Sequence, residues 1–315
     1  MQKSTKKILI YATTFAILGS SIGYTLCKAN WLDYSGYITH YAEEIVQDDF
    51  LISAHRGFSS LEVENTKEAI SLASEKGYID YIEIDTRMTS DGKLVLSHNN
   101  SLLVNSEETQ TRSISNTTYD QILDTEFMYT TFPYNGVFWP TAESLLMVDR
   151  RKNLNGREYH VVGLREGLEC CGDKKVLLDL KFNNNIEAFC EELKRELEGF
   201  DTSNICFQSL NIVGIKYLQD NTNYNCQVLI DSPRELVYAN NFTRIGLSYD
   251  LVTYEMIDKF IKEGKSISIW TINSTNVLDM VLNELGEHYK DVIYITDYPD
   301  LIISRLGEKQ KVLTK

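Results

Sequence analysis

The side chains best suited to chemistry gather between Ser53 and Leu102, and two of them are carboxylates. Glu83 and Asp85 lie in the apolar stretch 81–85. Successive side chains of a β-strand point to opposite faces, so these two carboxylates share one face of the expected strand. This spacing is suited to binding a metal ion on a rigid support.

Two histidines and an arginine belong to the same segment. His55 and Arg56 follow the short apolar stretch 50–54, and His98 follows the stretch 94–97. Both histidines are therefore expected at the carboxyl ends of strands, where barrels and open α/β sheets collect their functional residues. The sequence predicts one site that combines imidazole, guanidinium and carboxylate groups.

This segment resembles the opening signature of the glycerophosphodiester phosphodiesterase family. The matching motifs are His55-Arg56-Gly57, Glu64-Asn65-Thr66, Glu83-Ile84-Asp85, Thr89-Ser90-Asp91-Gly92 and the strand that ends in His98. Linked motifs form a far stronger signal than any one of them alone. Motifs further along the chain that resemble the family are Leu178-Asp179-Leu180-Lys181, Gln208-Ser209, Trp270-Thr271-Ile272-Asn273 and Thr296-Asp297-Tyr298-Pro299. The resemblance extends over residues 51–306.

The resemblance implies a (β/α)8 TIM barrel that hydrolyses glycerophosphodiesters to glycerol 3-phosphate and an alcohol. Such barrels use about 250 residues, which fits one domain at 49–308 in this chain of 315. Apolar β-rich stretches alternate with helical patterns, which is typical of parallel α/β architecture. The candidate strands are 50–54, 81–85, 94–97, 176–181, 205–208, 227–230, 245–248, 266–271 and 292–296. They outnumber the eight barrel positions by one, and 245–248 is the weakest candidate.

The expected metal ligands are Glu83, Asp85 and Asp179, whose hard carboxylate oxygens suit Mg²⁺ or Ca²⁺. A cation bound there would offset the negative charge of a phosphodiester. His55 and His98 are the expected acid and base, because imidazole titrates near neutrality.

Phosphate oxygens are expected to contact Arg56 through its planar fork and Lys181 as a point charge. Glu64 is expected to reach the site or its surroundings. Trp270 has two interpretations, core packing and a wall for the glycerol moiety, since large aromatic residues serve both purposes.

Each of these residues also has a structural interpretation. Glu83 and Asp85 could belong to a solvated face, but Tyr81 shares that face, which favours a buried strand. Asn65 is expected to cap the following helix, given the preference of asparagine for that position. Asp297 is expected to be a hydrogen-bonding residue that helps to close the barrel rather than a catalyst.

Three positions depart from the pattern of the resembled family. Asn99 follows the second histidine where aspartate is usual, and this change is expected to tune the orientation of His98. Asp179 stands where glutamate is commoner, so a metal would sit closer to its strand or be reached through water. Val63 replaces a proline, with no expected effect.

The composition is that of a globular protein, with 43% hydrophobic and 24% charged residues. The formal charge of −14 argues against a nucleic-acid partner. Of the six cysteines, five follow residue 169 without metal-type spacing, which argues against a disulfide scaffold and a zinc site. The long segment 99–174, aromatic in its middle, is expected to be an enlarged insertion that forms a substrate-selecting lid.

The first 29 residues predict a membrane anchor. Lys3, Lys6 and Lys7 precede the uncharged segment 8–27, which is about long enough to cross a bilayer. The lysines should stay cytoplasmic, so the expected stalk 30–48 and the catalytic domain would be extracytoplasmic, ahead of a tail at 309–315. A cleaved signal peptide and a secreted enzyme are the alternative.

Three functions compete. The first is a membrane-anchored glycerophosphodiester phosphodiesterase with a small-molecule or lipid-derived substrate. The second keeps the site and acts on a phospholipid headgroup or a glycerol-phosphate surface polymer. The third is a non-catalytic binding module. Against it, a site without catalysis would have no chemical reason to keep an acid, a base and metal ligands together.

Overall fold

A closed ring of parallel strands organises the part of the chain that this computed structural model describes, namely residues 50–105, 110–128, 154 and 157–313. The strands are β1 (Leu51–Ala54), β2 (Tyr81–Met88), β8 (Lys175–Leu180), β9 (Ile205–Ser209), β10 (Asn225–Ile230), β11 (Arg244–Ser248), β12 (Ser266–Trp270) and β13 (Val292–Thr296). Each is paired in parallel with the next, and β1 closes the ring by pairing with both β13 and β2. The expected TIM barrel is confirmed.

The seam between β1 and β2 is short. It holds the pairs Ser53↔Tyr81 and Ala54↔Ile82, whereas β2 and β8 stay in register from Tyr81↔Lys175 to Thr86↔Leu180. Beyond the end of β1, the amide of Gly57 donates to the carbonyl of Glu83 in β2 and extends the seam by one bond.

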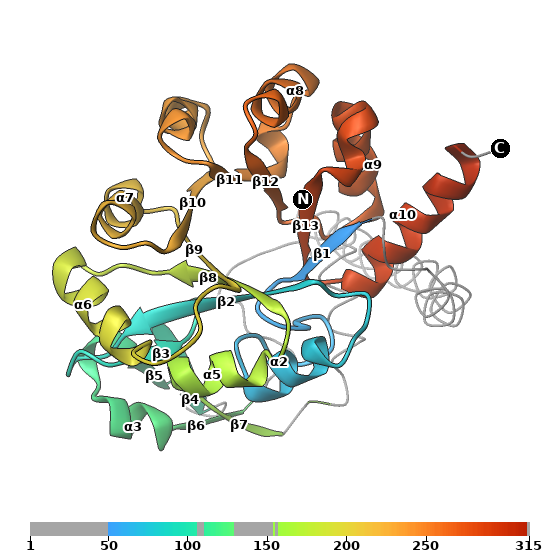
Figure 1. Cartoon of the computed structure of the whole chain (residues 1–315). Helices are drawn as coiled ribbons and strands as arrows, with labels where there is room; N and C mark the ends of the chain where they lie inside the picture. The colour runs from blue at the N-terminus through green and yellow to red at the C-terminus, as the bar shows by residue number, and fades with distance from the viewer. Residues whose placement is uncertain (1–49, 106–109, 129–153, 155–156, 314–315) are drawn as a thin grey trace, which may run out of the picture. The chain divides into compact units, whose positions relative to one another are not determined.

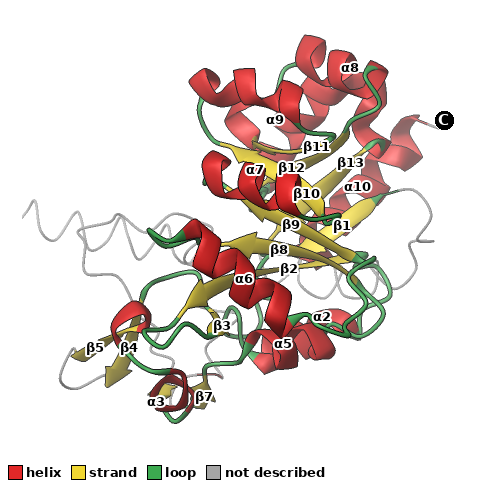
Figure 2. Ribbon diagram, turned by 60° about the vertical axis from the view of Figure 1, so that its left-hand side comes forward, coloured by secondary structure: helices red, strands yellow, loops and turns green. Residues whose placement is uncertain are grey.

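Helices cover the outside of the ring (Figures 1 and 2). They are α2 (Lys67–Ser74), α5 (Leu164–Cys170), α6 (Ile186–Glu196), α7 (Ile212–Asn221), α8 (Tyr254–Lys262), α9 (Thr275–Leu285) and α10 (Pro299–Leu313), with the 3-10 helices η3 (Pro233–Asn241), η4 (Tyr249–Leu251) and η5 (Gly286–Lys290). Short polar residues set the starts of several helices: Thr66, Asn211 and Ser274 each accept a backbone hydrogen bond from the first turn.

The strand assignment from sequence was wrong at one position. The doubted segment 245–248 lies in β11, between β10 and β12. The extra strand is β3 (Leu94–Leu96), which turns back and pairs antiparallel with β2, with Thr86 opposite Leu96. Because β3 is fully buried, its apolar residues resemble those of a barrel strand, and burial alone does not reveal strand direction.

A small group of elements lies beyond β3 (Figure 2). It comprises the hairpin β4 (Ser101–Asn105) and β5 (Gln110–Ser113), η1 (Ile114–Asn116), α3 (Tyr119–Leu123) and the pair β6 (Glu126–Met128) and β7 (Glu158–His160). Ile114 and Ile122 of this group, with Val161 just after β7, pack with Val95 of β3 in one buried cluster. Of the aromatic residues in the middle of the segment expected to form a lid, Phe127 lies in β6, and those from Tyr129 to Trp139 lie outside the described residues.

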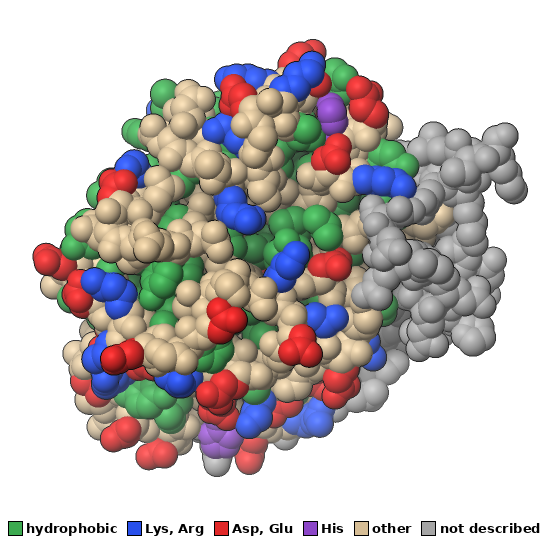
Figure 3. Space-filling model, in the orientation of Figure 1, with side chains coloured by type: hydrophobic (Ala, Val, Ile, Leu, Met, Phe, Trp, Pro, Cys, Tyr) green, Lys and Arg blue, Asp and Glu red, His purple; other side chains and the backbone are tan. Residues whose placement is uncertain are grey.

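The barrel interior has an apolar layer below the carboxyl ends of the strands. Tyr81, Leu177, Cys206, Ile293 and Ile295 form one buried cluster, and Trp270 packs against it. Tyr81 therefore shares the interior face with Glu83, as expected for a buried strand. Figure 3 shows acidic and basic side chains interspersed over one face of the molecule.

The expected anchor (8–27) and stalk (30–48) lie outside the described residues. In the part of the chain that the structure describes, we find no helix with both the length and the apolar character needed to span a bilayer.

Two glycines with positive φ provide a test of how tightly the loop after β1, which holds Gly57, packs against α2. Gly57 has φ +78°, and a Cβ there would lie 2.6 Å from the backbone carbonyl carbon of Ala69, whereas Gly92 has φ +80° and open space around it. Both Gly57→Ala and Gly92→Ala place a side chain in the left-handed region, which costs about 1–3 kcal/mol. Only Gly57→Ala also collides with α2, which adds a further ~1–3 kcal/mol.

Urea unfolding of the two variants measures the difference. We expect Gly57→Ala to lose clearly more unfolding free energy than Gly92→Ala. Equal losses would contradict the close contact between α2 and the loop after β1.

Candidate active site

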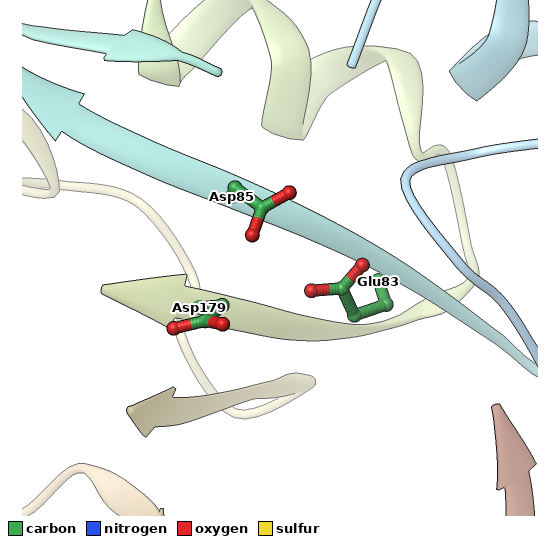
Figure 4. A group of neighbouring side chains, drawn as sticks. All are labelled: Glu83, Asp85 and Asp179. Atoms are coloured by element: carbon green, nitrogen blue, oxygen red, sulfur yellow. The ribbon is translucent and has the colours of Figure 1, made fainter. Parts of the chain in front are cut away.

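Three buried carboxylates meet at the interior of the barrel (Figure 4). Glu83 and Asp85 come from β2, and Asp179 comes from the adjacent strand β8, directly beside Asp85 in register. One oxygen from each of the three lies within 4.8 Å of the others. The structure brings together the residues that the sequence singled out as metal ligands.

Burial makes this cluster costly as a set of anions. It raises the pKa of Glu83, and the neighbouring Asp85 raises it further. Burial likewise raises the pKa of Asp179, against the opposing effect of Lys181. Burial also acts to raise the pKa of Asp85, but Lys181 and Arg56 outweigh it, so the net shift is downward. Carboxylates buried together need positive charge nearby to remain ionised.

The donor set fits a hard divalent cation. All three ligands are carboxylates, which Mg²⁺ and Ca²⁺ prefer. Oδ1 of Asp179 is buried and has no hydrogen-bond partner among the described residues, so one acceptor of the cluster is unsatisfied. The residues present can therefore hold such an ion.

Lys181 lies against this cluster. Its Nζ is 2.6 Å from Oδ2 of Asp179 and 2.9 Å from Oδ1 of Asp85. Although burial acts to lower the pKa of Lys181, these two carboxylates raise it above the ordinary value, so the ammonium form is favoured.

Arg56 borders the carboxylates with both its backbone and its side chain. The amide donates to Oε2 of Glu83 at 2.9 Å, and Nη1 donates to Oε2 of Glu64 at 2.9 Å. Nε lies 3.4 Å from Oδ2 of Asp85, an ion pair without hydrogen-bond geometry. Glu64 thus contacts the guanidinium of Arg56.

Asn65 does not cap the following helix, and that prediction was wrong. The cap is Thr66, whose side chain accepts from the amide of Ala69. Asn65 instead donates from Nδ2 to Oδ2 of Asp85 at 2.8 Å and accepts from the amide of Asp85 at 2.9 Å. Asn65 has a positive φ of 57°, a conformation that asparagine tolerates better than most residues.

His55 is held by a second carboxylate. Its Nδ1 lies 2.7 Å from Oδ1 of Asp297, and its Nε2 lies 3.8 Å from Oε2 of Glu83. Asp297 also accepts from the hydroxyl of Ser59 at 2.7 Å and from Nδ2 of Asn273 at 2.6 Å. Asp297 is the hydrogen-bonding residue that we expected, but its contact with His55 was missed. The signal was its place directly after the last barrel strand.

Charge favours protonation of His55. Burial acts to lower its pKa, but Asp297 and Glu83 outweigh burial, so the pKa of His55 is raised above 6.5. Burial acts to raise the pKa of Asp297, but His55 outweighs it, and the pKa falls well below 3.8.

His98 has a different environment. The amide of Ser97 donates to the carbonyl of Asp85, so the returning strand β3 brings His98 to the carboxylates. Nδ1 of His98 lies 3.1 Å from Oδ1 of Asn99, and its carbonyl accepts from Nε of Arg87. Burial lowers the pKa of His98, against the effect of Asp85. The two histidines are thus shifted in opposite directions.

Trp270 ends β12 and is half-buried against the apolar layer of the interior. Its indole nitrogen is buried and has no partner in the described part of the chain. Core packing is therefore observed, and the indole N–H has no acceptor among the described residues.

Fold and site together define a TIM-barrel enzyme with its polar site at the carboxyl ends of the strands. The sequence model of the Glycerophosphoryl diester phosphodiesterase family matches residues 55–301, so the chain belongs to this family. It is a glycerophosphodiester phosphodiesterase, a hydrolase of phosphoric diesters. Among curated proteins, no match was found.

Several solved structures with similar folds are described as phosphodiesterases of glycerophosphodiesters. A phosphodiesterase from Oleispira antarctica, in complex with the product sn-glycerol-3-phosphate, has a TM-score of 0.61 and 19% identity over 82% of this chain and 97% of its own. A putative glycerophosphoryl diester phosphodiesterase from Silicibacter pomeroyi has a TM-score of 0.68 and 18% identity over 82% and 95%. A glycerophosphodiester phosphodiesterase from Thermotoga maritima has a TM-score of 0.57 and 20% identity over 81% of this chain and 97% of its own.

The pair His55–Asp297 predicts a pH window of stability. The raised pKa of His55 adds stability that is complete below pH 6.5 and is lost as the pH rises through the folded value. The lowered pKa of Asp297 adds stability above pH 3.8 that is lost as the pH falls through its folded value. The difference in unfolding free energy between wild type and Asp297→Asn should be largest between pH 3.8 and pH 6.5.

Urea unfolding across a pH series tests this expectation. Asp173→Asn, at an exposed position, serves as the matched control and should show no such window. A gap for Asp297→Asn that is flat from pH 4 to pH 8 would refute the ion pair.

Proposed function

We propose that this enzyme cleaves small glycerophosphodiesters with the help of Mg²⁺ or Ca²⁺ held by Glu83, Asp85 and Asp179. One observation carries the metal assignment: a buried carboxylate cluster that includes an oxygen of Asp179 without a partner. A bound divalent ion would offset the charge of the phosphoryl oxygens and polarise the phosphorus towards attack.

Two cationic side chains are suited to hold the phosphate. Lys181 carries a favoured positive charge beside the carboxylates, and Arg56 presents its guanidinium there while Glu64 fixes its direction. A planar guanidinium and an ammonium can contact different oxygens of one phosphoryl group. Trp270, at the end of β12, offers a flat apolar surface and an indole donor to the glycerol moiety.

The histidines divide the proton transfers according to their environments. His55, kept protonated by Asp297, is suited to donate a proton to the leaving alkoxide oxygen. His98, with its lowered pKa, is suited to accept a proton from the nucleophile that attacks the phosphorus. Groups whose environments move their pKa values apart are the expected acid and base of such a reaction.

The described residues offer no observation that favours a phospholipid headgroup or a surface polymer over a small diester. The proposal therefore keeps the small-molecule substrate.

Release of glycerol 3-phosphate from glycerophosphocholine tests this proposal. We expect release by the full chain with Mg²⁺ or Ca²⁺, and loss with a chelator that either ion reverses. Glu83→Gln and Asp179→Asn should require a higher ion concentration, while the exposed Glu191→Gln should behave as wild type. Undiminished release in the presence of chelator would overturn the role of the metal.

The same assay tests the histidines. His55→Ala and His98→Ala should each lower kcat roughly 100- to 10,000-fold, the usual contribution of an acid or base. The exposed His160→Ala is the control and should keep full activity. Activity near wild type in either site variant, with an intact fold, would remove that histidine from the mechanism.

We also propose that the catalytic domain is held outside the cytoplasm by residues 1–29. The support is the cluster Lys3, Lys6 and Lys7 ahead of the uncharged segment 8–27. The full chain should sediment with membranes and be cut by external protease, whereas a chain without 1–29 should stay soluble. A shortened protein in the medium would instead support secretion after cleavage.

A further inference from the structure

A row of polar residues continues from the carboxylates across the barrel interior. Asp179 of β8 is the register partner of Gln208 in β9, and Gln208 is the partner of Gln227 in β10. Register partners on neighbouring parallel strands point to the same face of a sheet. Gln208 and Gln227 therefore share the interior face with Asp179.

Hydrogen bonds fix the two amide groups. Nε2 of Gln227 donates to Oε1 of Gln208 at 2.8 Å and to the hydroxyl oxygen of Ser268 at 2.9 Å, which uses both of its hydrogens. Ser268 and Gln227 are fully buried, and Gln208 is 2% exposed. The carbonyl oxygen of Gln208 therefore faces Gln227, and its amide nitrogen points away from Gln227.

The reverse orientation of both amides is less favourable. In the present one, Oε1 of Gln227 is the buried atom without a partner. If both amide groups were turned, Nε2 of Gln227 would occupy the position of Oε1 and its two hydrogens would have no acceptor. A buried donor without a partner is rarer than a buried acceptor without one. The carbonyl oxygen of Gln208 would also face the carboxylate row. The hydrogen-bond network therefore favours the orientation in which the amide nitrogen of Gln208, and not its carbonyl oxygen, faces the carboxylate row.

The amide nitrogen of Gln208 makes no hydrogen bond to any described residue, and its neighbour in the row is Asp179, whose Oδ1 also lacks a partner. Register partners on β8 and β9 thus carry an acceptor and a donor without hydrogen-bond partners among the described residues. An oxygen atom of a bound ligand would satisfy the donor, and the proposed cation would satisfy the acceptor. Phosphoryl and hydroxyl oxygens of a phosphodiester both meet this requirement.

We propose that Gln208 is a further substrate-binding residue, whose amide donates to an oxygen of the phosphodiester beside Asp179. Gln227 and Ser268 are positioning residues that hold the amide from inside the barrel. This inference rests on the proposed function. A neutral donor held in place by its neighbours stabilises developing negative charge without reorganising.

The test measures both catalysis and binding. Gln208→Met removes the donor at similar volume and should lower kcat/KM roughly 100- to 1,000-fold, the loss typical of one aimed donor. Calorimetry with glycerol 3-phosphate and Mg²⁺ should show weaker binding than wild type. The exposed Gln121→Met is the matched control and should match wild type in both measurements.

A double-mutant cycle separates positioning from general structural support. Gln227→Met should lower the affinity for glycerol 3-phosphate in the wild-type background and have little effect once Gln208 is already methionine. Full additivity of the two losses in binding would overturn the positioning role of Gln227.

Two failures remain distinguishable. If wild type releases glycerol 3-phosphate and folded Gln208→Met matches it in kcat/KM and in binding, the inference about Gln208 is wrong and the proposed function stands. If wild type neither binds nor releases glycerol 3-phosphate, the proposed function itself fails, and the inference falls with it.

Discussion

Burying Glu83, Asp85 and Asp179 side by side is the constraint on which the surrounding structure depends. Anions removed from water need compensation by charge or hydrogen bonds. The backbone amide of Arg56 supplies it to Glu83, and Asn65 supplies it to Asp85. Lys181 serves two of the carboxylates, and the remaining oxygen of Asp179 is left for a ligand. The conformation of the loop after β1 follows from these requirements.

That loop shows how local backbone geometry serves the cluster. Arg56 and Asn65 both have φ 57°, outside the regions that most side chains prefer. Such conformations are kept where the surroundings stabilise them. Here the surroundings are the carboxylates of β2, which receive hydrogen bonds from both residues, so the unusual loop and the buried charges depend on each other.

The fold and most of the site could be predicted from the sequence because their signals are local. Glu83 and Asp85 are two residues apart on one strand, and His55 directly follows a strand. The direction of β3 could not be predicted, since an apolar stretch pairs equally well either way. The contact of Asp297 with His55 and the orientation of Gln208 depend on distant segments, which spacing along the chain does not show.

Asn65 shows why a strong local preference can mislead. A short polar residue before a helix predicts a cap, and Thr66 meets that need one position later. Asn65 is therefore free to bind the strand that carries Asp85, and only the tertiary structure reveals this choice.

The seam between β1 and β2 has a consequence for the dynamics of the enzyme. Only two residue pairs join these strands, and the contacts of Gly57 and Arg56 with Glu83 continue the junction into the site. Segments with few stabilising bonds open first in native proteins. A ligand that bridges His55 or Arg56 to the carboxylates of β2 would hold the two edges of the sheet together, because binding to the closed form favours it. Occupancy of the site and resistance of the barrel to local unfolding would then rise together.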